Sequence, residues 1–473
     1  MLEYIKRVPQ NNIAVIFHDK YTYCVSYKEL FDSIVSVADI LKEQVMVSQV
    51  VGICMPRSVS FLTTICACLH LHIPFLIISP SLPDARKDFM IKESGISLLI
   101  TNHPSEISKN TSISIVKIIN PENGKLNLIN DICYILYTSG STGIPKGVLI
   151  SRKNLDCFLN IVIKTLPLEK FQSFLACSDF SFDISLLEML VPLMLGMTMH
   201  MTSDVYLRNP HAISILLKSN SVDVVQLTPS LLKMLFLFQK KSLQFMSSIK
   251  LLLIGGEPFP EELKTELLET IPNVYNMYGP TEATIWCSCM KLNHDSEIGI
   301  GYPFKGTTFS IRDNSGKEIP NGEKGELWIE GEQVGLGYVN QQIGHENFVQ
   351  ILNKRFYRTG DLCIKNNQEN CIYLGRTDYQ IKYRGHRIEL EEIEKTILSD
   401  SRIEQTIVKF QEQQIICFYV SNESVPELES EIKHMLKSRI PSYMLPSKYQ
   451  RVQKLNVKSN GKIDRNQLDL IFL

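Results

Sequence analysis

The sequence predicts an α/β fold in which parallel sheets are covered by helices, joined to a smaller β-rich section. Up to about residue 375 of the 473-residue chain, apolar runs of strand length alternate with helical patterns. Continuous apolar strands separated by helices are typical of parallel sheets that are buried on both faces. The clearest strand-like runs are 49–54, 97–101, 222–226 and 250–254.

After Met290 the pattern changes to short strands separated by Gly, Asn and Asp turns, at 313–316, 321–322 and 366–367. This pattern of short strands and turns predicts a β-rich subdomain. From residue 378 onward the sequence predicts a compact α/β unit. It has a helix that begins at Leu390, strands at 405–409 and 415–420, and a helix at 427–439.

Composition and charge exclude some classes of protein. A net charge of −1 gives no electrostatic case for nucleic-acid binding. The most apolar stretch, 62–80, is interrupted by His70, His72 and Pro74, which favours a buried helix and strand over a membrane span. The N-terminus lacks the order of a signal peptide, and many of the twelve cysteines lie in apolar runs. We therefore expect a cytoplasmic protein that contacts no membrane.

One loop points to phosphate chemistry. Tyr137-Thr-Ser-Gly-Ser-Thr-Gly-Ile-Pro-Lys-Gly147 lies between two apolar runs that predict short buried strands. Closely spaced Gly, Ser and Thr residues expose backbone N–H groups and hydroxyls, and Lys146 adds a positive charge, so the loop suits a polyphosphate. The residue order differs from that of a Walker loop. Taken alone, the loop would also fit a flexible surface turn.

Further motifs follow the loop or precede it in a fixed order. They are Ser26-Tyr-Lys-Glu-Leu30, Pro83-Asp-Ala-Arg86, Phe182-Asp-Ile-Ser185, Asn276-Met-Tyr-Gly-Pro-Thr-Glu282, Tyr357-Arg-Thr-Gly-Asp361, Gly375-Arg-Thr-Asp378, Lys382-Tyr-Arg-Gly-His-Arg-Ile-Glu389 and Asn460-Gly-Lys-Ile-Asp464. Together with the loop, these motifs resemble the adenylate-forming enzyme superfamily over nearly the whole chain. Within it, the pattern is most similar to the amino-acid adenylation domains of nonribosomal peptide synthetases.

The resemblance implies a division into two domains. Residues 1–377 would form an adenylation core with the ATP and amino-acid sites. Residues 378–473 would form a small mobile lid that rotates about a hinge at Asp378 between two half-reactions. The segment 71–80 departs from the usual family sequence, which puts only packing details of the core in doubt.

The resemblance also implies roles for individual residues in adenylate formation from ATP and a carboxylic acid. Lys462 would be catalytic, bridging the substrate carboxylate and a phosphate oxygen, and Glu282 would bind Mg²⁺. The β- and γ-phosphates would be held by Thr138, Ser139, Gly140, Ser141, Thr142, Gly143 and Lys146. Adenine and ribose would contact Gly256, Glu257, Asn276, Tyr278, Thr281, Asp361 and Arg376. A carboxylate such as Asp361 suits the ribose diol because it offers two acceptor oxygens.

Asp183 discriminates between classes of substrate. In amino-acid-activating relatives, an Asp at this place pairs with the α-ammonium of the substrate. A buried carboxylate without a cation would be costly, so its presence argues against fatty acids. The competing interpretation is an N-cap for the helix that begins at Ile184, because Asp-x-Ser-x-x-Glu also fits a helix start.

The rest of the predicted substrate pocket is mostly bulky and apolar. Its residues are Ile184, Leu187, Gln226, Leu253, Gly255, Met277, Ile285 and Trp286. Trp286 leaves little room for a substrate side chain, and the set resembles that of glycine-activating domains. We therefore expect glycine, with L- or D-alanine as the nearest rival; steric exclusion suits this choice because one methyl group changes binding by only about 1–3 kcal/mol.

A second step is implied by the hinge and by the segment around Gly385. The acyl group would pass to the thiol of a phosphopantetheine carried by a separate carrier protein, because the chain shows no carrier motif of its own. We expect a free-standing monomeric ligase. The alternatives are a D-alanine–carrier-protein ligase, an acyl- or aryl-CoA ligase that uses the same chemistry, and a non-catalytic relative that acts as a binding module.

Overall fold

The computed structural model describes residues 1–45, 49–96, 98–102, 113–117, 131–140, 142–219, 222–421, 427–456 and 465. The chain divides into two compact units. Unit 1 comprises Met1–Pro80, Ile91–Leu136 and Gly147–Thr377, and unit 2 comprises Ser81–Met90, Tyr137–Lys146 and Asp378–Leu473. The longest segment of unit 2 starts at Asp378, but two short segments group with it. The domain division at residues 377 and 378, and the hinge, stay predictions.

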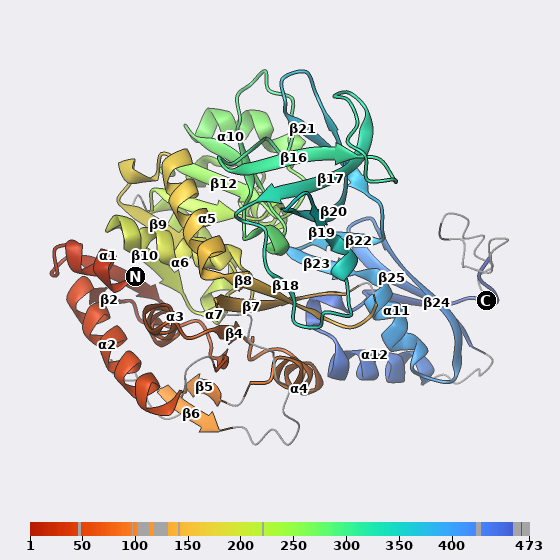
Figure 1. Cartoon of the computed structure of the whole chain (residues 1–473), viewed down its shortest axis with the longest axis horizontal. Helices are drawn as coiled ribbons and strands as arrows, with labels where there is room; N and C mark the ends of the chain where they lie inside the picture. The colour runs from red at the N-terminus through yellow and green to blue at the C-terminus, as the bar shows by residue number, and fades with distance from the viewer. Residues whose placement is uncertain are drawn as a thin grey trace. The chain divides into compact units, whose positions relative to one another are not determined.

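The largest sheet of unit 1 has parallel strands at its centre and antiparallel strands at its edges. Strands β9, β10 and β12 of this sheet are labelled in Figure 1. In sheet order its described strands are β15 (Tyr302–Pro303), β14 (Ser288–Lys291), β13 (Val274–Tyr278), β12 (Leu251–Gly255), β11 (Val224–Leu227), β9 (Ser173–Ala176), β10 (Thr198–Thr202), β1 (Ile13–His18) and β2 (Tyr23–Ser26).

Strand β12 shows why this sheet is buried on both sides. Leu251 and Leu253 pack into one hydrophobic core, while Leu252 and Ile254 pack into another. Because side chains alternate across a strand, a continuous apolar run places leucine-sized side chains on both faces. The predicted strand at 250–254 is confirmed, and so is the one at 222–226 within a residue or two.

A second sheet carries the segments on either side of the glycine-rich loop. Its described strands, in sheet order, are β18 (Gly337–Tyr338), β8 (Lys146–Ser151), β7 (Ile132–Thr138), β4 (Phe75–Ile77), β3 (Val51–Cys54), β5 (Leu98–Asn102) and β6 (Ile113–Lys117). Strands β3, β4, β5 and β7 pair in parallel. The loop therefore connects two neighbouring strands, as the apolar runs predicted.

The predicted β-rich subdomain is an antiparallel sheet. It contains β16 (Thr307–Arg312), β17 (Lys324–Gly331), β20 (Lys354–Lys365), β19 (Phe348–Ile351) and β21 (Cys371–Arg376). It has its own core, which includes Phe309, Ile329 and Tyr357. The register of β20 with β21 places Asp361 opposite Arg376, so the sheet itself brings two predicted nucleotide residues together.

Helices of unit 1 begin and end where their capping residues predict. Ser26 and Glu29 form a capping box at the start of α2, Pro229 occupies the first turn of α9, and Gly196 ends α6 in a left-handed conformation. The described helices are α1 (Leu2–Arg7), α2 (Tyr27–Gln44), α3 (Val59–Leu71), α5 (Arg152–Thr165), α6 (Ile184–Leu195), α7 (Asp204–Leu207), α8 (Pro210–Lys218), α9 (Pro229–Phe238) and α10 (Lys264–Thr270).

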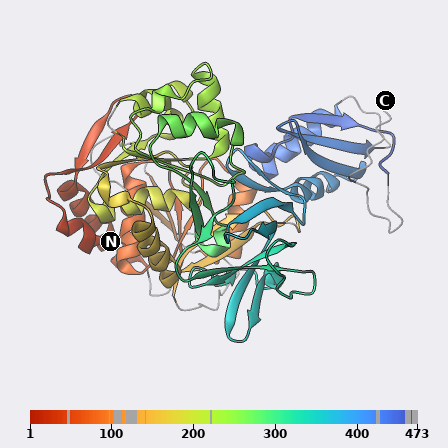
Figure 2. The same ribbon diagram turned by 90° about the horizontal axis from the view of Figure 1, so that it is seen from above.

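The C-terminal segment of unit 2 is itself α/β, as predicted, and is drawn in blue in Figure 2. Helices α11 and α12 pack with the sheet strands around Ile393, Ile415 and Ile432. The elements are β22 (Gln380–Tyr383), β23 (His386–Glu389), α11 (Leu390–Leu398), β24 (Ile403–Gln411), β25 (Gln414–Ser421), α12 (Leu428–Arg439) and β26 (Lys448–Arg451), with α4 (Asp84–Glu93) starting in the short segment Ser81–Met90.

Short 3-10 turns complete the described elements. They are η1 (Leu168–Lys170), η2 (Gln244–Met246), η3 (Glu261–Leu263), η4 (Thr281–Ala283), η5 (His345–Asn347) and η6 (Ser442–Met444). In the part of the chain that the structure describes, no helix combines the length and the apolar character needed to cross a membrane.

Candidate active site

The predicted pocket residues meet where three parallel strands of unit 1 end. Gln226 pairs in register with Leu253, and Gly255 pairs with Met277, so β11, β12 and β13 present them side by side. Ile184 lies in the first turn of α6, and its carbonyl accepts a hydrogen bond of 3.2 Å from Nε2 of Gln226. The carboxyl ends of parallel strands are where open α/β sheets bind their ligands.

Trp286 closes this pocket on the β12 side. The residue is fully buried, and its indole Nε1 donates a hydrogen bond of 2.8 Å to Oε1 of Gln226. A Cβ atom placed on Gly255 would lie 2.6 Å from Cη2 of the indole, so only glycine fits beside the ring. Leu187, Leu253, Met277 and Ile285 belong to the same buried cluster as Trp286. The structure therefore brings the predicted apolar lining together.

Asp183 is a buried carboxylate with an unsatisfied oxygen. Its side chain is 7% exposed, and Oδ2 has no hydrogen-bond partner among the described residues. Burial raises the pKa of Asp183 to about 6, against the opposing hydrogen bond from the Thr281 side chain. Asp183 does precede α6, but its side chain makes no capping hydrogen bond. Asp183 therefore occupies the N-cap position of α6, but its carboxylate does not cap the helix.

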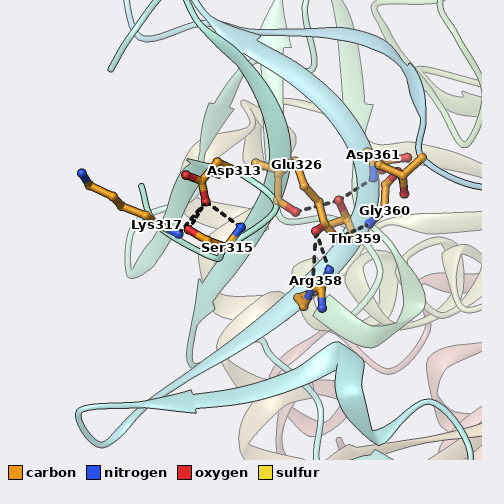
Figure 3. Close-up of polar contacts among 10 residues, drawn as sticks. Asp313, Ser315, Lys317, Glu326, Arg358, Thr359, Gly360 and Asp361 are labelled. Atoms are coloured by element: carbon orange, nitrogen blue, oxygen red, sulfur yellow. Dashed lines mark hydrogen bonds and ion pairs between the residues drawn. The ribbon is translucent and has the colours of Figure 1, made fainter. Parts of the chain in front are cut away.

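Three predicted nucleotide residues form a second buried cluster. The Tyr278 hydroxyl donates a hydrogen bond to Oδ2 of Asp361, and Nη1 of Arg376 lies 2.7 Å from Oδ1. Figure 3 shows how β20 holds Asp361: its N–H donates to Oγ1 of Thr359 at 2.9 Å. Asp361 is therefore fixed in position, with each carboxylate oxygen bonded.

Glu326 of β17 supports the same stretch of β20 from the neighbouring strand. Its carboxylate accepts the Gly360 N–H at 3.1 Å and pairs with Arg358 at 2.9 Å (Figure 3). Further along this sheet, Asp313 ties the turn between β16 and β17 by accepting from Ser315 and Lys317. The contacts of Glu326 stabilise β20, the strand that carries Asp361.

The amide of Asn276 has a fixed orientation. Its Nδ2 donates to the Gly299 carbonyl at 2.7 Å, which makes Oδ1 the acceptor that remains for another group. An acceptor is what the exocyclic amine of adenine requires. Two further predicted nucleotide residues directly follow β12. Gly256 has a φ of 87°, and Glu257 accepts a hydrogen bond from the Ser230 hydroxyl.

Glu282 could serve as a magnesium ligand, but further ligands would be needed to hold the ion. It is fully buried in η4, and the Tyr338 hydroxyl donates to its Oε1 at 2.8 Å. Within the described ranges, no group of three or more His, Cys, Asp or Glu side chains could hold a metal. Mg²⁺ is commonly bound through one carboxylate together with substrate phosphates and water. The donor set is compatible with that mode.

The glycine-rich loop belongs to unit 2, where it contacts β23 and α11. Ser139 Oγ donates to the Arg387 carbonyl at 2.8 Å, and the Gly140 N–H donates to Oε2 of Glu392 at 3.2 Å. Arg86 also pairs with Glu392. The loop is tightly turned, because a Cβ on Gly140 would lie 1.8 Å from the Ile144 carbonyl, and Gly143 has a φ of 78°.

Some predicted site residues are not grouped by the structure. Ser141 and Lys462 lie outside the described residues. Thr138, Thr142, Gly143 and Lys146 fall in unit 2 with the loop, whereas the pocket and the nucleotide cluster fall in unit 1. Asp378 begins the long segment of unit 2, and its carboxylate accepts the Gln380 N–H at 3.2 Å.

Comparison with known proteins decides the family. The model of the AMP-binding enzyme family matches residues 3–339. This chain belongs to that family. A D-alanine–D-alanyl carrier protein ligase from Bacillus licheniformis is 32% identical over 439 residues, which cover 87% of this chain and 86% of that protein. A dimodular nonribosomal peptide synthase from Bacillus subtilis is 30% identical over 471 residues.

That second match covers 94% of this chain and 20% of the synthase, so the chain spans a fifth of that relative's length. Among solved structures, the Vibrio cholerae adenylation domain AlmE in complex with glycyl-adenosine-5'-phosphate has a TM-score of 0.83 at 21% identity. The alignment covers 98% of this chain and 95% of that one. At this identity the likeness concerns the fold, and it confirms the predicted α/β class. The chain is an AMP-forming ligase.

The sequence alone did not single out every residue that shapes this AMP-binding enzyme. Glu188 is fully buried in α6 and accepts a hydrogen bond of 2.8 Å from Nε2 of Gln226. Gln333 is fully buried and donates to the Trp286 carbonyl at 2.8 Å. The signal for Glu188 was present, since it is a lone acid in the apolar helix Ile184–Leu195. Gln333 carried no such signal.

Proposed function

We propose that this AMP-forming ligase activates a small amino acid, glycine first and alanine next, and loads it onto the phosphopantetheine thiol of a carrier protein. One observation carries the choice of an amino acid. Asp183 places a buried carboxylate, with an oxygen that no described residue bonds, beside a pocket that Trp286 closes. A substrate ammonium would neutralise and hydrogen-bond that oxygen.

The close packing around Trp286 supports a small substrate side chain. The indole of Trp286 reaches the Gly255 backbone, and Leu187 and Ile285 are buried within the same apolar cluster. A fatty or aromatic acid would leave Asp183 without a cation and would need the space that the indole fills. Both features favour glycine over a larger amino acid, and an amino acid over a simple carboxylic acid.

In the first half-reaction, an oxygen of the substrate carboxylate attacks the α-phosphorus of ATP. A carbonyl–oxygen–phosphorus linkage forms, and the bond to the bridging oxygen breaks, so pyrophosphate leaves with the electron pair. Asp361 would accept the ribose hydroxyls, and Asn276 would accept from the adenine amine through Oδ1. Catalysis of this kind is mainly positioning and neutralisation of charge.

The remaining roles concern the charged groups. Lys462 would bridge the carboxylate and a phosphate oxygen, the loop from Thr138 to Lys146 would hold the outer phosphates, and Glu282 would ligate Mg²⁺. The bound ion would supply charge neutralisation at the phosphates. The Tyr338 hydroxyl orients Glu282 for this role by its hydrogen bond to Oε1.

In the second half-reaction, the carrier thiol attacks the acyl carbon and AMP leaves, giving a thioester. The printed names of the relatives include a D-alanyl carrier protein ligase and a peptide synthase, which supports a carrier as acceptor. Rotation about Asp378, a carrier supplied by another polypeptide, a monomeric state and a cytoplasmic location are parts of the same proposal. D-Alanine is the alternative substrate that the relative favours.

Amino-acid-dependent ATP–pyrophosphate exchange tests the proposal. The panel should contain the standard amino acids, D-alanine, and several aryl and fatty acids, with Asp183→Ala as the variant that removes the ammonium partner. A dominant glycine signal that Asp183→Ala abolishes is the expected result. A D- or L-alanine signal would keep the mechanism and correct the pocket. Exchange with a non-amino acid would overturn the choice of substrate class.

A further inference from the structure

The indole of Trp286 is fixed by a chain of hydrogen bonds that runs away from the pocket. Nε1 of Trp286 donates to Oε1 of Gln226, and Nε2 of Gln226 donates to Oε1 of Glu188, each at 2.8 Å. The residues are buried in the interior of unit 1. We call Glu188 and Gln226 the indole clamp.

Glu188 and the Ile184 carbonyl together fix which way the amide of Gln226 points, because Nε2 of Gln226 donates to both. An indole N–H can only donate, so it needs the carbonyl oxygen of the amide rather than its nitrogen. Glu188 acts as an acceptor at both oxygens: Oε2 accepts the Ser178 N–H at 2.9 Å, and Oε1 accepts from the Ser178 hydroxyl and from Gln226. A carboxylate that only accepts therefore forces the amide nitrogen toward itself and the amide oxygen toward Trp286.

The positive charge of Arg57 stabilises the ionised carboxylate of Glu188. Its guanidinium is buried, donates to the carbonyls of Thr202 and Ala176 at 2.9 and 2.7 Å, and also bonds the Ser178 carbonyl. Burial raises the pKa of Glu188, while the Ser178 hydrogen bonds and the charge of Arg57 oppose that rise. The clamp is thus anchored in the strand ends of β9 and β10 rather than in the pocket.

A second set of contacts fixes the backbone before Trp286. Thr284 and Ile285 have φ values of 58° and 69°, which are strained for β-branched residues. Oγ1 of Thr284 donates to the Gln333 carbonyl at 2.6 Å, and Nε2 of Gln333 donates to the Trp286 carbonyl at 2.8 Å. Oε1 of Gln333 in turn accepts from Thr307 at 3.0 Å. We call Thr284 and Gln333 the backbone clamp.

From this arrangement we infer that Glu188 and Gln333 are specificity-determining positioning residues: through the two clamps they hold the Trp286 ring against Gly255 and so set the size of the amino-acid pocket. The inference rests on the proposed function, because it takes Trp286 as the group that limits the substrate side chain. Neither residue needs to touch the substrate. Each acts by denying the indole an alternative position.

The replacement Glu188→Gln shows how the indole clamp would fail. A glutamine at this position presents one donor and one acceptor where the carboxylate presents two acceptors. With its oxygen at the Oε1 place, the glutamine keeps Gln226 and leaves the Ser178 N–H facing an amide nitrogen; with its oxygen at the Oε2 place, it sets an amide nitrogen against Nε2 of Gln226. The second orientation favours a turn of the Gln226 amide, which would set its nitrogen against the indole N–H. The ring then gains freedom to leave Gly255.

Fluorescence tests the clamps without relying on activity. The chain has two tryptophans, so Trp328→Phe leaves Trp286 as the single reporter. In that background we would measure emission maximum and acrylamide quenching for Glu188→Gln and for Gln333→Met, with circular dichroism to confirm folding. Both variants should shift the emission to the red and raise the quenching constant relative to Trp328→Phe alone.

Asp223→Asn provides a matched control. Asp223 is a buried carboxylate just before β11 that accepts the Gln172 N–H at 2.7 Å and pairs with Lys250 at 2.6 Å. The substitution makes the same acid-to-amide change near the other end of the strand that carries Gln226. It should leave the Trp286 signal unchanged. An equal change in the control would mean that general loosening, and not the clamp, moves the ring.

Selectivity is the second readout, measured as the ratio of kcat/KM for glycine over L-alanine in pyrophosphate exchange. Glu188→Gln and Gln333→Met should lower that ratio about tenfold, since one methyl group in a pocket is worth at least that much discrimination. Gln226→Met should match Glu188→Gln, because it removes the indole acceptor directly. An unchanged ratio beside altered fluorescence would overturn the specificity role.

The two readouts separate the inference from the function on which it rests. Unchanged fluorescence in both clamp variants would overturn the inference whatever the activity. Absence of exchange in the parent protein with every amino acid would contradict the proposed function and, with it, the selectivity role. The fluorescence result would still decide whether the clamps hold Trp286.

Discussion

Two buried aspartates of unit 1, one in the amino-acid pocket and one in the nucleotide cluster, are satisfied in opposite ways. Asp183 and Asp361 are 7% and 2% exposed. Asp361 has an oxygen bonded by Tyr278 and the other paired with Arg376, whereas Oδ2 of Asp183 has no partner in the described part of the chain. Their settings differ in charge as well, since Glu282 lies near Asp183 and raises its pKa further.

The two sets of partners indicate what each carboxylate is suited to bind. A carboxylate whose charge is already paired can accept neutral hydroxyls without needing a cation, which fits a ribose. A buried carboxylate with an unbonded oxygen gains most from a ligand that is itself positive, which fits an ammonium. The same type of side chain is thus suited to two kinds of ligand because its surroundings differ.

We expect the largest loss of folding stability in the cluster of Asp361, where both carboxylate oxygens are already bonded. Asp361→Asn removes one partner of the buried ion pair with Arg376, which should lower the free energy of unfolding by about 3–5 kcal/mol. Urea denaturation measures the loss. The double variant Asp361→Asn/Arg376→Met should recover part of the lost stability. An unchanged midpoint for the single variant would show that the ion pair does not stabilise the fold.

Asp183→Asn should act in the opposite direction on stability. Because the folded pKa of about 6 lies above the ordinary 3.8, ionised Asp183 costs stability at neutral pH, so the amide should stabilise the ligand-free enzyme by about 1–3 kcal/mol. The gain should be complete above pH 6 and disappear below about pH 4. Denaturation at several pH values would show this, and a loss of stability at pH 7.5 would contradict it.

The same variant should lose activity, because the ammonium then lacks its buried partner. We expect kcat/KM for the amino acid to fall by an amount that corresponds to a loss of about 2–5 kcal/mol in transition-state stabilisation. The affinity for ATP should change little. If both affinities fell together, Asp183 would be a structural residue of the whole site.

The pH dependence of kcat/KM for the amino acid tests whether Asp183 pairs with the substrate ammonium. Only ionised Asp183 can pair with an ammonium, so kcat/KM for the amino acid should fall about tenfold per pH unit below pH 6. An aspartate with an ordinary pKa would give that fall only below about pH 4. Saturating ATP isolates this limb of the profile. Its presence in the residual activity of Asp183→Asn would assign it to another group.

Tyr278→Phe should give the smallest effect. It removes the hydroxyl that donates to Asp361 but leaves the Arg376 pair intact. A hydrogen bond to a charged group contributes about 1.5–3 kcal/mol, and water can replace part of it near a ligand site. We expect a modest rise in the KM for ATP and no change in the choice of amino acid. A changed preference would place Tyr278 in the substrate pocket.

Much of the fold follows from short-range patterns in the sequence. Apolar runs at 222–226 and 250–254 predicted β11 and β12 because buried parallel strands need apolar residues on both faces. The turn residues after Met290 predicted the antiparallel sheet, and the helix at 427–439 matches Leu428–Arg439. The grouping of the loop 137–146 with unit 2 could not be predicted, because it depends on tertiary contacts such as that between Gly140 and Glu392.

The sequence predicted which residue types gather at the candidate site, but not the hydrogen-bond partners that hold them in place. The motif around Asp183 left a helix cap and an ammonium partner both open; the structure places Asp183 at the N-cap position without a side-chain capping bond, and the ammonium role stays a proposal. Gln226 was predicted as a lining residue, yet both ends of its amide are bonded to protein. Such partners come from distant segments, Glu188 and Trp286, so no local pattern reveals them.

The order of the pocket residues along the chain has a consequence for the exchange of specificity between related enzymes. The carboxylate proposed to pair with the substrate ammonium, the three strand ends and Trp286 all fall within one continuous segment from Asp183 to Trp286. A recombination event that moves this segment would carry the lining, with Glu188, as a single piece. Gln333 would stay behind in the recipient. We therefore expect such transplants to keep their selectivity only in hosts whose own β-rich region supplies an amide at that place.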